Sequence, residues 1–157
     1  GFEGEESLVI SDFQSLCKVT FNPVETNVPD ALGEDFTLAY LQNAVRRNKS
    51  KNVKAFLIDQ SIVKGIGNAY ADEILWKANI SPKSTVGKIP EARLTELYAA
   101  VSDVLKDAIA NIERISPDII SGEERSFLKV HNSRKKVTDE GDKILLQKIA
   151  AKTTYYT

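Results

Sequence analysis

Cysteine and histidine are nearly absent from this chain of 157 residues, which contains one of each. The single cysteine, Cys17, excludes an internal disulfide and any cysteine-based zinc site within the chain, so we expect no metal and no cofactor. The single histidine, His131, has no serine or cysteine at a spacing that suggests a catalytic partner. We therefore interpret His131 as a structural residue.

Long apolar runs are also absent. No signal peptide or membrane span is visible, because the longest apolar runs extend over only a few residues. We therefore predict a soluble, cytoplasmic protein without a membrane partner. With 42% apolar residues the chain can still bury a core, and its length suits one domain, or one domain and a fragment of another.

A net charge of −1 argues weakly against a nucleic-acid partner, but the distribution of charge favours one. Residues 1–40 contain eight acidic residues and one basic residue, a net charge of −7, so the remaining 20 basic and 14 acidic residues give +6. Basic residues concentrate at 46–54 and at 134–136. Such runs are often only a solvated surface, but these two flank a candidate phosphate site.

That candidate site is Gly65-Ile66-Gly67, which directly precedes a predicted helix beginning at Asn68. Glycine permits close approach of another backbone, and the free N–H groups of a helix start bind anions. Asn68 could cap the helix and also donate to a phosphate oxygen. A simple tight turn is the alternative. A dinucleotide site is excluded because the third glycine is missing, and a P-loop because no Gly-Lys-Ser/Thr follows.

The rest of the chain shows helical periodicity in the middle and β-like alternation at both ends. Residue 35 should cap the first helix, and Pro90 should be the first residue of the longest one. The expected helices are 35–47, 52–59, a helix from 68, and 90–115; the expected strands are 7–11, 16–21, 127–131, 143–149 and 153–157.

The stretch LIDQSIVKGIGNAYADEILWKANISP (57–82) resembles the helix-two-turns-helix signature of the formamidopyrimidine-DNA glycosylase and endonuclease VIII family. The resemblance implies that Asn68 and the backbone beside it hold a DNA phosphate next to the lesion, and that Lys54 lies near the DNA backbone. The matching residues are Lys54, Asp59, Gln60, Gly65, Gly67, Asn68, Tyr70, Glu73, Leu75, Ala78, Ile80 and Pro82. Glu73 is better interpreted as packing or capping support than as a general acid. The resemblance also allows His131 to be a peripheral contact to a phosphate.

The C-terminal segment resembles the finger of the same family, which usually contains four zinc-binding cysteines and an arginine at the hairpin tip. Here Lys152 occupies the arginine position and Thr157 a cysteine position. The resemblance implies a zinc-less finger in which Lys152 is a stand-in for the catalytic arginine, although a plain exposed turn residue is the alternative. We expect apolar packing of the hairpin to replace the metal, through Ile144, Leu146, Ile149 and Tyr155.

The resemblance implies a mainly α protein: the end of an N-terminal β-sandwich and a linker (1–33), a helix-two-turns-helix domain (34–116) and the finger (117–157). Such enzymes remove oxidised bases and nick the strand through an N-terminal proline, whereas this chain begins Gly1-Phe2-Glu3. We therefore expect a monomeric DNA-binding fragment of a base-excision-repair glycosylase/AP lyase, inactive alone and associated with the bacterial nucleoid. Its expected partner is duplex DNA with a damaged base or an abasic site. The alternatives are an RNA-binding module of the ribosomal helix-two-turns-helix type and a helical protein-interaction domain.

Overall fold

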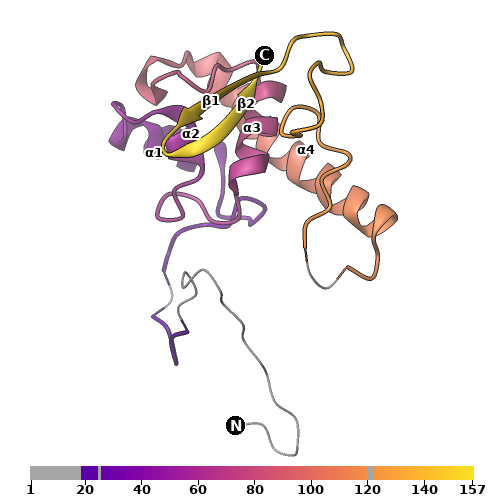
Figure 1. The fold of residues 1–157 in the computed structure, drawn as a ribbon. Helices are drawn as coiled ribbons and strands as arrows, with labels where there is room; N and C mark the ends of the chain where they lie inside the picture. Colours follow the sequence, from indigo (N-terminus) through magenta and orange to yellow (C-terminus); the bar gives the residue numbers. More distant parts are fainter. Residues whose placement is uncertain (1–18, 25, 120–121) are drawn as a thin grey trace, which may run out of the picture.

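The computed structural model describes residues 19–24, 26–119 and 122–157, and in them four helices precede a two-stranded antiparallel hairpin (Figure 1). The predicted strand 7–11 and most of 16–21 lie outside the described residues, and residues 19–22 form no strand. The elements are α1 (Leu38–Arg47), α2 (Val53–Leu57), α3 (Asn68–Lys77), the 3-10 turn η1 (Val86–Lys88), α4 (Glu91–Ile115), β1 (Leu145–Ile149) and β2 (Lys152–Tyr156).

The helices begin where side chains or backbone geometry permit it, and two predicted starts were wrong. Helix α1 is capped by Thr37, whose hydroxyl accepts from the Tyr40 N–H at 3.1 Å, and not by residue 35. Helix α2 is capped by Asn52, whose side chain accepts from the Ala55 N–H. Pro90 is the extended N-cap of α4 and not its first helical residue.

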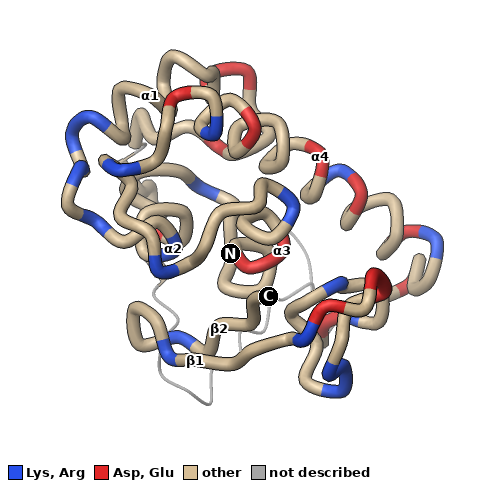
Figure 2. Tube along the Cα trace, turned by 90° about the horizontal axis from the view of Figure 1, so that it is seen from above, with Lys and Arg blue, Asp and Glu red and all other residues tan. Residues whose placement is uncertain are grey.

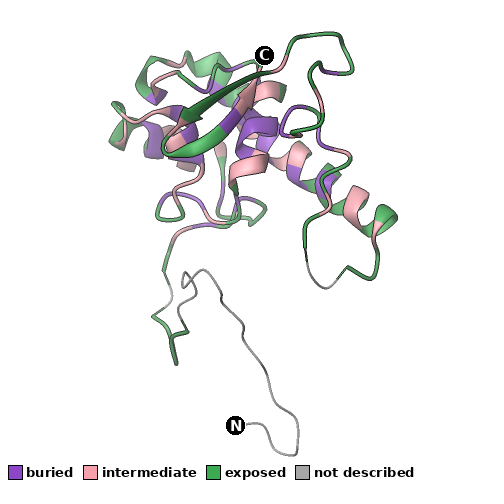
Figure 3. Ribbon diagram, viewed as in Figure 1, coloured by how far each residue is buried: buried purple, intermediate pink, exposed green. Residues whose placement is uncertain are grey.

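The core lies where α4 packs against α1 and α3 (Figure 3). The predicted apolar stripe of α4 is confirmed as core in its first two-thirds, where Leu97 and Val101 are fully buried. Beyond this region the stripe emerges from the core, and Ile109 is 47% exposed. The same core buries Val53, Phe56 and Leu57 of the short helix α2, so tertiary packing holds a helix too short to be stable alone.

The connection from α2 to α3 is held by side-chain hydrogen bonds. The Gln60 amide accepts from the Gly65 N–H at 3.1 Å and donates to the Ile66 carbonyl at 3.0 Å. Gly65 has a φ of +89°, a conformation that L side chains rarely adopt, so this turn requires glycine. The turn therefore fixes where the first residue of α3 lies.

The C-terminal hairpin is confirmed, with Ile149 opposite Lys152 and a two-residue turn, Ala150-Ala151, between the strands. Both turn residues have positive φ, which matches the right-handed twist of a tight hairpin. The expected apolar packing was wrong for Leu146, which is 64% exposed, whereas Ile144, Ile149 and Tyr155 are half-buried. The predicted strand 127–131 was also wrong, since these residues form turns and bends.

Candidate nucleic-acid interface

The start of α3 presents unoccupied backbone donors. Gly67 is the N-cap, no side chain caps the helix, and the first helical hydrogen bond is from the Ala71 N–H to the Gly67 carbonyl. The predicted cap, Asn68, is the first helical residue instead. A Cβ added at Gly67 would meet no atom within 4 Å, so this side of the helix start is open. An exposed helix start with free N–H groups suits an anion.

The two glycines of the predicted site have different surroundings. A Cβ at Gly65 would lie 3.0 Å from a carboxylate oxygen of Asp30, so an acidic side chain already lies against this residue. Asp30 also forms an isolated β-bridge with Lys64, which holds it there. Gly65 therefore supports the turn, and the position open to an anion is at Gly67 and Asn68.

Asn68 connects this helix start to the hairpin. Its amide nitrogen donates to the Thr153 carbonyl at 3.1 Å. Its amide oxygen is buried and accepts no hydrogen bond from any residue the structure describes. One amide N–H remains for a ligand, and the contact brings the residue after Lys152 next to the start of α3. Asn68 and Lys152, which are 84 positions apart in the sequence, thus belong to one surface.

Lys54 is fully buried and binds the hairpin. Its ammonium lies 2.7 Å from the Thr154 hydroxyl and 3.1 Å from the Thr153 carbonyl, and it forms a 2.7 Å ion pair with Asp72 of α3. Burial lowers the pKa of Lys54, and the hydrogen bond to Asp72 opposes that shift. Because no part of Lys54 is exposed, the geometry supports a role in holding the hairpin and does not support direct contact with a phosphate.

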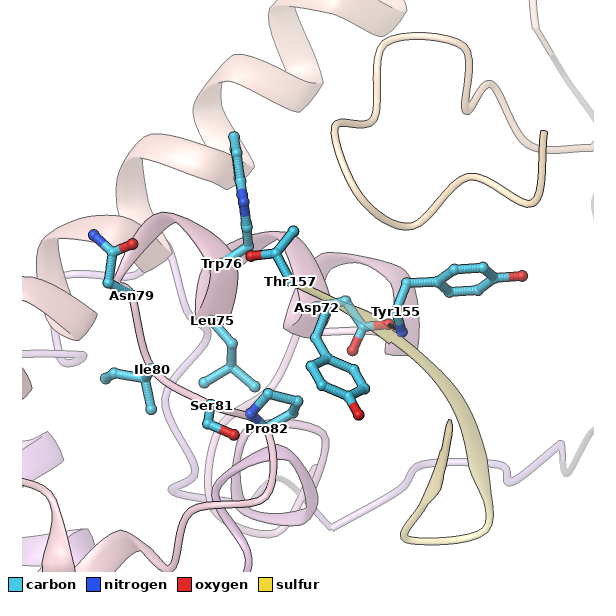
Figure 4. Close-up of a pocket in the computed structure, with 10 residues that line it drawn as sticks. Asp72, Leu75, Trp76, Asn79, Ile80, Ser81, Pro82, Tyr155 and Thr157 are labelled. Carbon is cyan, nitrogen blue, oxygen red and sulfur yellow. Dashed lines mark hydrogen bonds between the residues drawn. The ribbon is translucent and has the colours of Figure 1, made fainter. Parts of the chain in front are cut away.

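Asp72 is the centre of this polar cluster, and sequence reasoning missed it. Its second oxygen lies 2.7 Å from His131 Nδ1 and accepts from the Tyr155 N–H at 2.9 Å. Figure 4 shows Asp72 beside Tyr155, with Trp76 further along α3 near Thr157, around a hollow of about 180 Å³. The available signal was an acidic residue inside an otherwise apolar helix face. We call Lys54, Asp72, His131 and Thr154 the polar clamp.

Glu73, the neighbour of Asp72, binds the loop that precedes the hairpin. Its carboxylate accepts from the N–H groups of Lys129, Val130 and His131, at 2.7–2.9 Å. Glu73 is 4% exposed, so these three donors replace the water that an ionised carboxylate would otherwise require. The interpretation of Glu73 as structural support is confirmed, although it holds a loop and caps no helix. The interpretation of His131 as a structural residue is confirmed as well.

Lys152 remains available to a ligand. It is exposed, directly follows the hairpin turn, and takes part in no ion pair among the described residues. Those residues include no group of three His, Cys, Asp or Glu side chains positioned to hold a metal ion. None of the described helices is long and apolar enough to cross a membrane.

Comparison with known proteins identifies the family. Residues 28–118 match the model of the formamidopyrimidine-DNA glycosylase H2TH domain. This chain belongs to the formamidopyrimidine-DNA glycosylase family. A relative bearing that name in Pelotomaculum thermopropionicum is 33% identical over 133 residues, covering 81% of this chain and 48% of the relative. An "uncharacterized formamidopyrimidine-DNA glycosylase-like protein" of Mycobacterium tuberculosis is 42% identical over 103 residues, covering 66% of this chain and 63% of that protein.

Solved structures of formamidopyrimidine-DNA glycosylases have the same fold. The Lactococcus lactis enzyme, non-covalently bound to DNA containing an AP site, aligns with a TM-score of 0.67 at 25% identity and covers 82% of this chain and 47% of that chain. A second complex of the L. lactis protein, with THF-DNA and an inhibitor, gives a TM-score of 0.70 at 27% identity. The chain thus spans about half the length of the glycosylases it matches.

Proposed function

We propose that this chain is the DNA-binding portion of a base-excision-repair glycosylase/AP lyase that removes oxidised bases. In this proposal the open start of α3 holds a backbone phosphate through the N–H groups after Gly67 and the remaining amide N–H of Asn68. Lys152 holds a phosphate from the hairpin side. The partner is duplex DNA with a damaged base or an abasic site, bound by a monomer.

The hydrogen bond from Asn68 to the Thr153 carbonyl carries this proposal. This bond joins the helix start and the residue after Lys152 into one surface. The start of α3 and Lys152 can therefore bind phosphates of the same DNA strand. Structural neighbours were solved in complex with DNA containing an abasic site and with DNA containing carbocyclic 8-oxo-G, which supports the choice of ligand.

The hairpin is proposed to be a zinc-less finger. The polar clamp is the feature that replaces a metal, because it attaches β2 to α2 and α3 through a buried ion pair and hydrogen bonds. Glycosylase and lyase activities are proposed for the whole protein, while these 157 residues are proposed to bind DNA without cleaving it. Lysine presents a point charge where the family has a forked guanidinium, so the contribution of Lys152 is proposed to be phosphate binding.

The test is binding of the 157-residue chain to duplex DNA carrying an abasic-site analogue, compared with the intact duplex. Asn68→Ala should weaken binding to the abasic duplex by about 1–3 kcal/mol, the range for a hydrogen bond to a charged group. Asn111→Ala, at a half-buried position near the C-terminal end of α4, is the matched control and should leave binding unchanged.

Two results would contradict the proposal. Equal binding by wild type and Asn68→Ala would show that the helix start does not contact the DNA. A preference for structured RNA over abasic DNA would favour an RNA-binding module of the ribosomal helix-two-turns-helix type. Thr153 keeps its hydrogen bond from Lys54 in the variant, so hydrogen exchange of the β2 amides should confirm that the hairpin stays docked.

A further inference from the structure

Two segments of the chain contain basic residues and no acidic residue. Residues 36–58 contain five basic residues and no Asp or Glu, and residues 74–90 contain three and again no Asp or Glu. The chain as a whole carries 21 basic and 22 acidic residues, so both segments depart strongly from its average composition. Neither segment includes the open helix start at Gly67 and Asn68.

The fold brings these two segments into direct contact. The Gly87 N–H donates to the Lys49 carbonyl at 3.0 Å, the Val86 N–H to the Lys51 carbonyl at 2.9 Å, and the Val53 N–H to the Ser84 carbonyl at 2.9 Å. A Cβ at Gly87 would lie 2.7 Å from the Lys49 carbonyl oxygen, so only glycine allows this approach. The basic turn after α1 is therefore fixed beside η1.

The cations gathered in this way are largely free. Lys49, Lys83 and Lys88 are exposed and form no ion pair with any described residue. Lys83 and Lys88 line a hollow of about 360 Å³ together with Arg93 of α4, which is paired with Glu96. The remaining polar side chains of the hollow are those of Asn79, Ser81, Ser84 and Thr85. No carboxylate lines the hollow. Figure 2 shows Lys and Arg positions gathered around the turn after α1, whereas α4 shows both signs of charge.

We propose that the surface of Lys49, Lys83, Lys88 and Arg93, here called the basic groove, binds the phosphodiester backbone of nucleic acid. It would be a second contact, separate from the start of α3 and from Lys152. Lysine and arginine side chains with neighbouring hydroxyl and amide donors are the groups that contact DNA phosphates. A row of cations spread over two segments suits a polyanion better than a single small anion. The choice of nucleic acid rests on the proposed function, and an acidic protein or an anionic membrane would be the other occupants.

The experiment measures binding of the 157-residue chain to intact and abasic duplexes over a range of salt concentrations. Lys88→Glu should weaken binding to both duplexes by the same factor, because a backbone contact outside the lesion does not discriminate between them. It should also lower the slope of log Kobs against log salt by about 0.9, the value for one lost phosphate contact. The matched control is Lys106→Glu, the same charge change at an exposed position of α4.

Three outcomes overturn the inference. Equal losses for Lys88→Glu and Lys106→Glu would mean that only net charge matters. Lys88-dependent binding to vesicles of anionic phospholipid, with duplex binding unaffected, would assign the groove to membranes. If duplex binding depends on Asn68 and not on Lys88, the basic groove is not a DNA contact and the proposed function is unaffected. If duplex binding depends on Lys88 and not on Asn68, the basic groove is supported and the proposed phosphate site at the start of α3 is contradicted.

Discussion

The carboxylate of Asp72 contacts Lys54, His131 and the Tyr155 N–H, and its side chain is completely buried. We therefore expect the hairpin to depend on Asp72 more than on any other described residue. Its carboxylate forms the ion pair with Lys54, and both side chains have no exposed surface. Removing one partner of a buried pair leaves an uncompensated charge, which costs far more than losing an exposed pair. The contribution of Asp72 to the free energy of unfolding therefore comes from its burial and its partners, and not from its being an aspartate.

Asp72→Asn should therefore lower the free energy of unfolding by about 3–5 kcal/mol, measured by urea denaturation. Asp139→Asn is the matched control, because Asp139 also contacts two lysines, Lys129 and Lys135, but lies in water and should contribute much less. A double variant with Lys54→Met should lose less than the sum of the two single losses, because the pair acts as a unit. Similar losses for Asp72→Asn and Asp139→Asn would show that the ion pair is not the source of stability.

Asp59 should give the protein a distinct acid dependence. Hydrogen bonds from Lys51 and Ser61 lower the pKa of Asp59 from 3.8 to about 2. Because the folded pKa is below the unfolded one, this stabilisation is present above about pH 4 and is lost as the pH falls toward 2. Its size should be about 1 kcal/mol, since the pair lies partly in water.

The measurement is the difference in unfolding free energy between wild type and Asp59→Asn from pH 2 to pH 6. The difference should be largest at the upper end and should shrink across the window between about pH 4 and about pH 2. A constant difference over the whole range would show that the carboxylate does not titrate as its contacts require.

The hairpin is the element whose local sequence fits its conformation least well. Ala150 and Ala151 have φ values of +51° and +60°, and the left-handed region costs an L residue with a Cβ about 1–2 kcal/mol. Asparagine and glycine are the residues this type of turn favours. The strain is tolerated because the polar clamp fixes β2 from the other side.

Replacing Ala150-Ala151 by Asn-Gly should raise the free energy of unfolding by about 1 kcal/mol or more, measured by thermal and urea denaturation. Ala110→Gly on the exposed face of α4 is the matched control for adding a glycine and should lower stability by about 1 kcal/mol. A loss of stability in the Asn-Gly variant would show that the turn is not strained.

The helices and the hairpin could be predicted because their signals are local. Apolar residues at helical spacing marked α1, α2 and α4, and Gly65 and Gly67 marked the start of α3. The polar clamp could not be predicted, because nothing near Lys54 in the sequence indicates that Thr154 will satisfy it. The strand at 127–131 was wrong for a related reason: three of its N–H groups are bound by Glu73, a partner more than 50 residues away. The predicted domain boundaries and DNA contacts stay predictions.

At the scale of the whole molecule, the polar clamp should make the hairpin and the helices unfold together. Trp76 is the only tryptophan and lies on α3 beside the hollow formed with the hairpin, so its fluorescence reports on that junction. In wild type the Trp76 transition should coincide with the loss of helix measured by circular dichroism. Thr154→Val removes the hydroxyl that binds the Lys54 ammonium, so the hairpin should open first and the two transitions should separate.

Hydrogen exchange of the β1 and β2 amides provides the check on that prediction. In Thr154→Val these amides should exchange at lower free energy than the amides of α4, whereas in wild type the inner pairs should approach the global value. Thr153→Val, an exposed neighbour on the same strand, is the matched control. Coincident transitions in Thr154→Val would mean that the hydroxyl does not couple the hairpin to the helices.

The separation of the clamp residues along the chain also determines the order in which the molecule can assemble. Lys54 meets its hairpin partners across 99 and 100 residues, and Asp72 meets Tyr155 across 83. Synthesis from the N-terminus completes α1 to α4 before the hairpin, so Lys54 and Asp72 at first lack their partners on β2. The residues that close the domain are therefore made after all four of these helices, and a ribosome that stalls before residue 153 would leave the helices without their contacts to the hairpin.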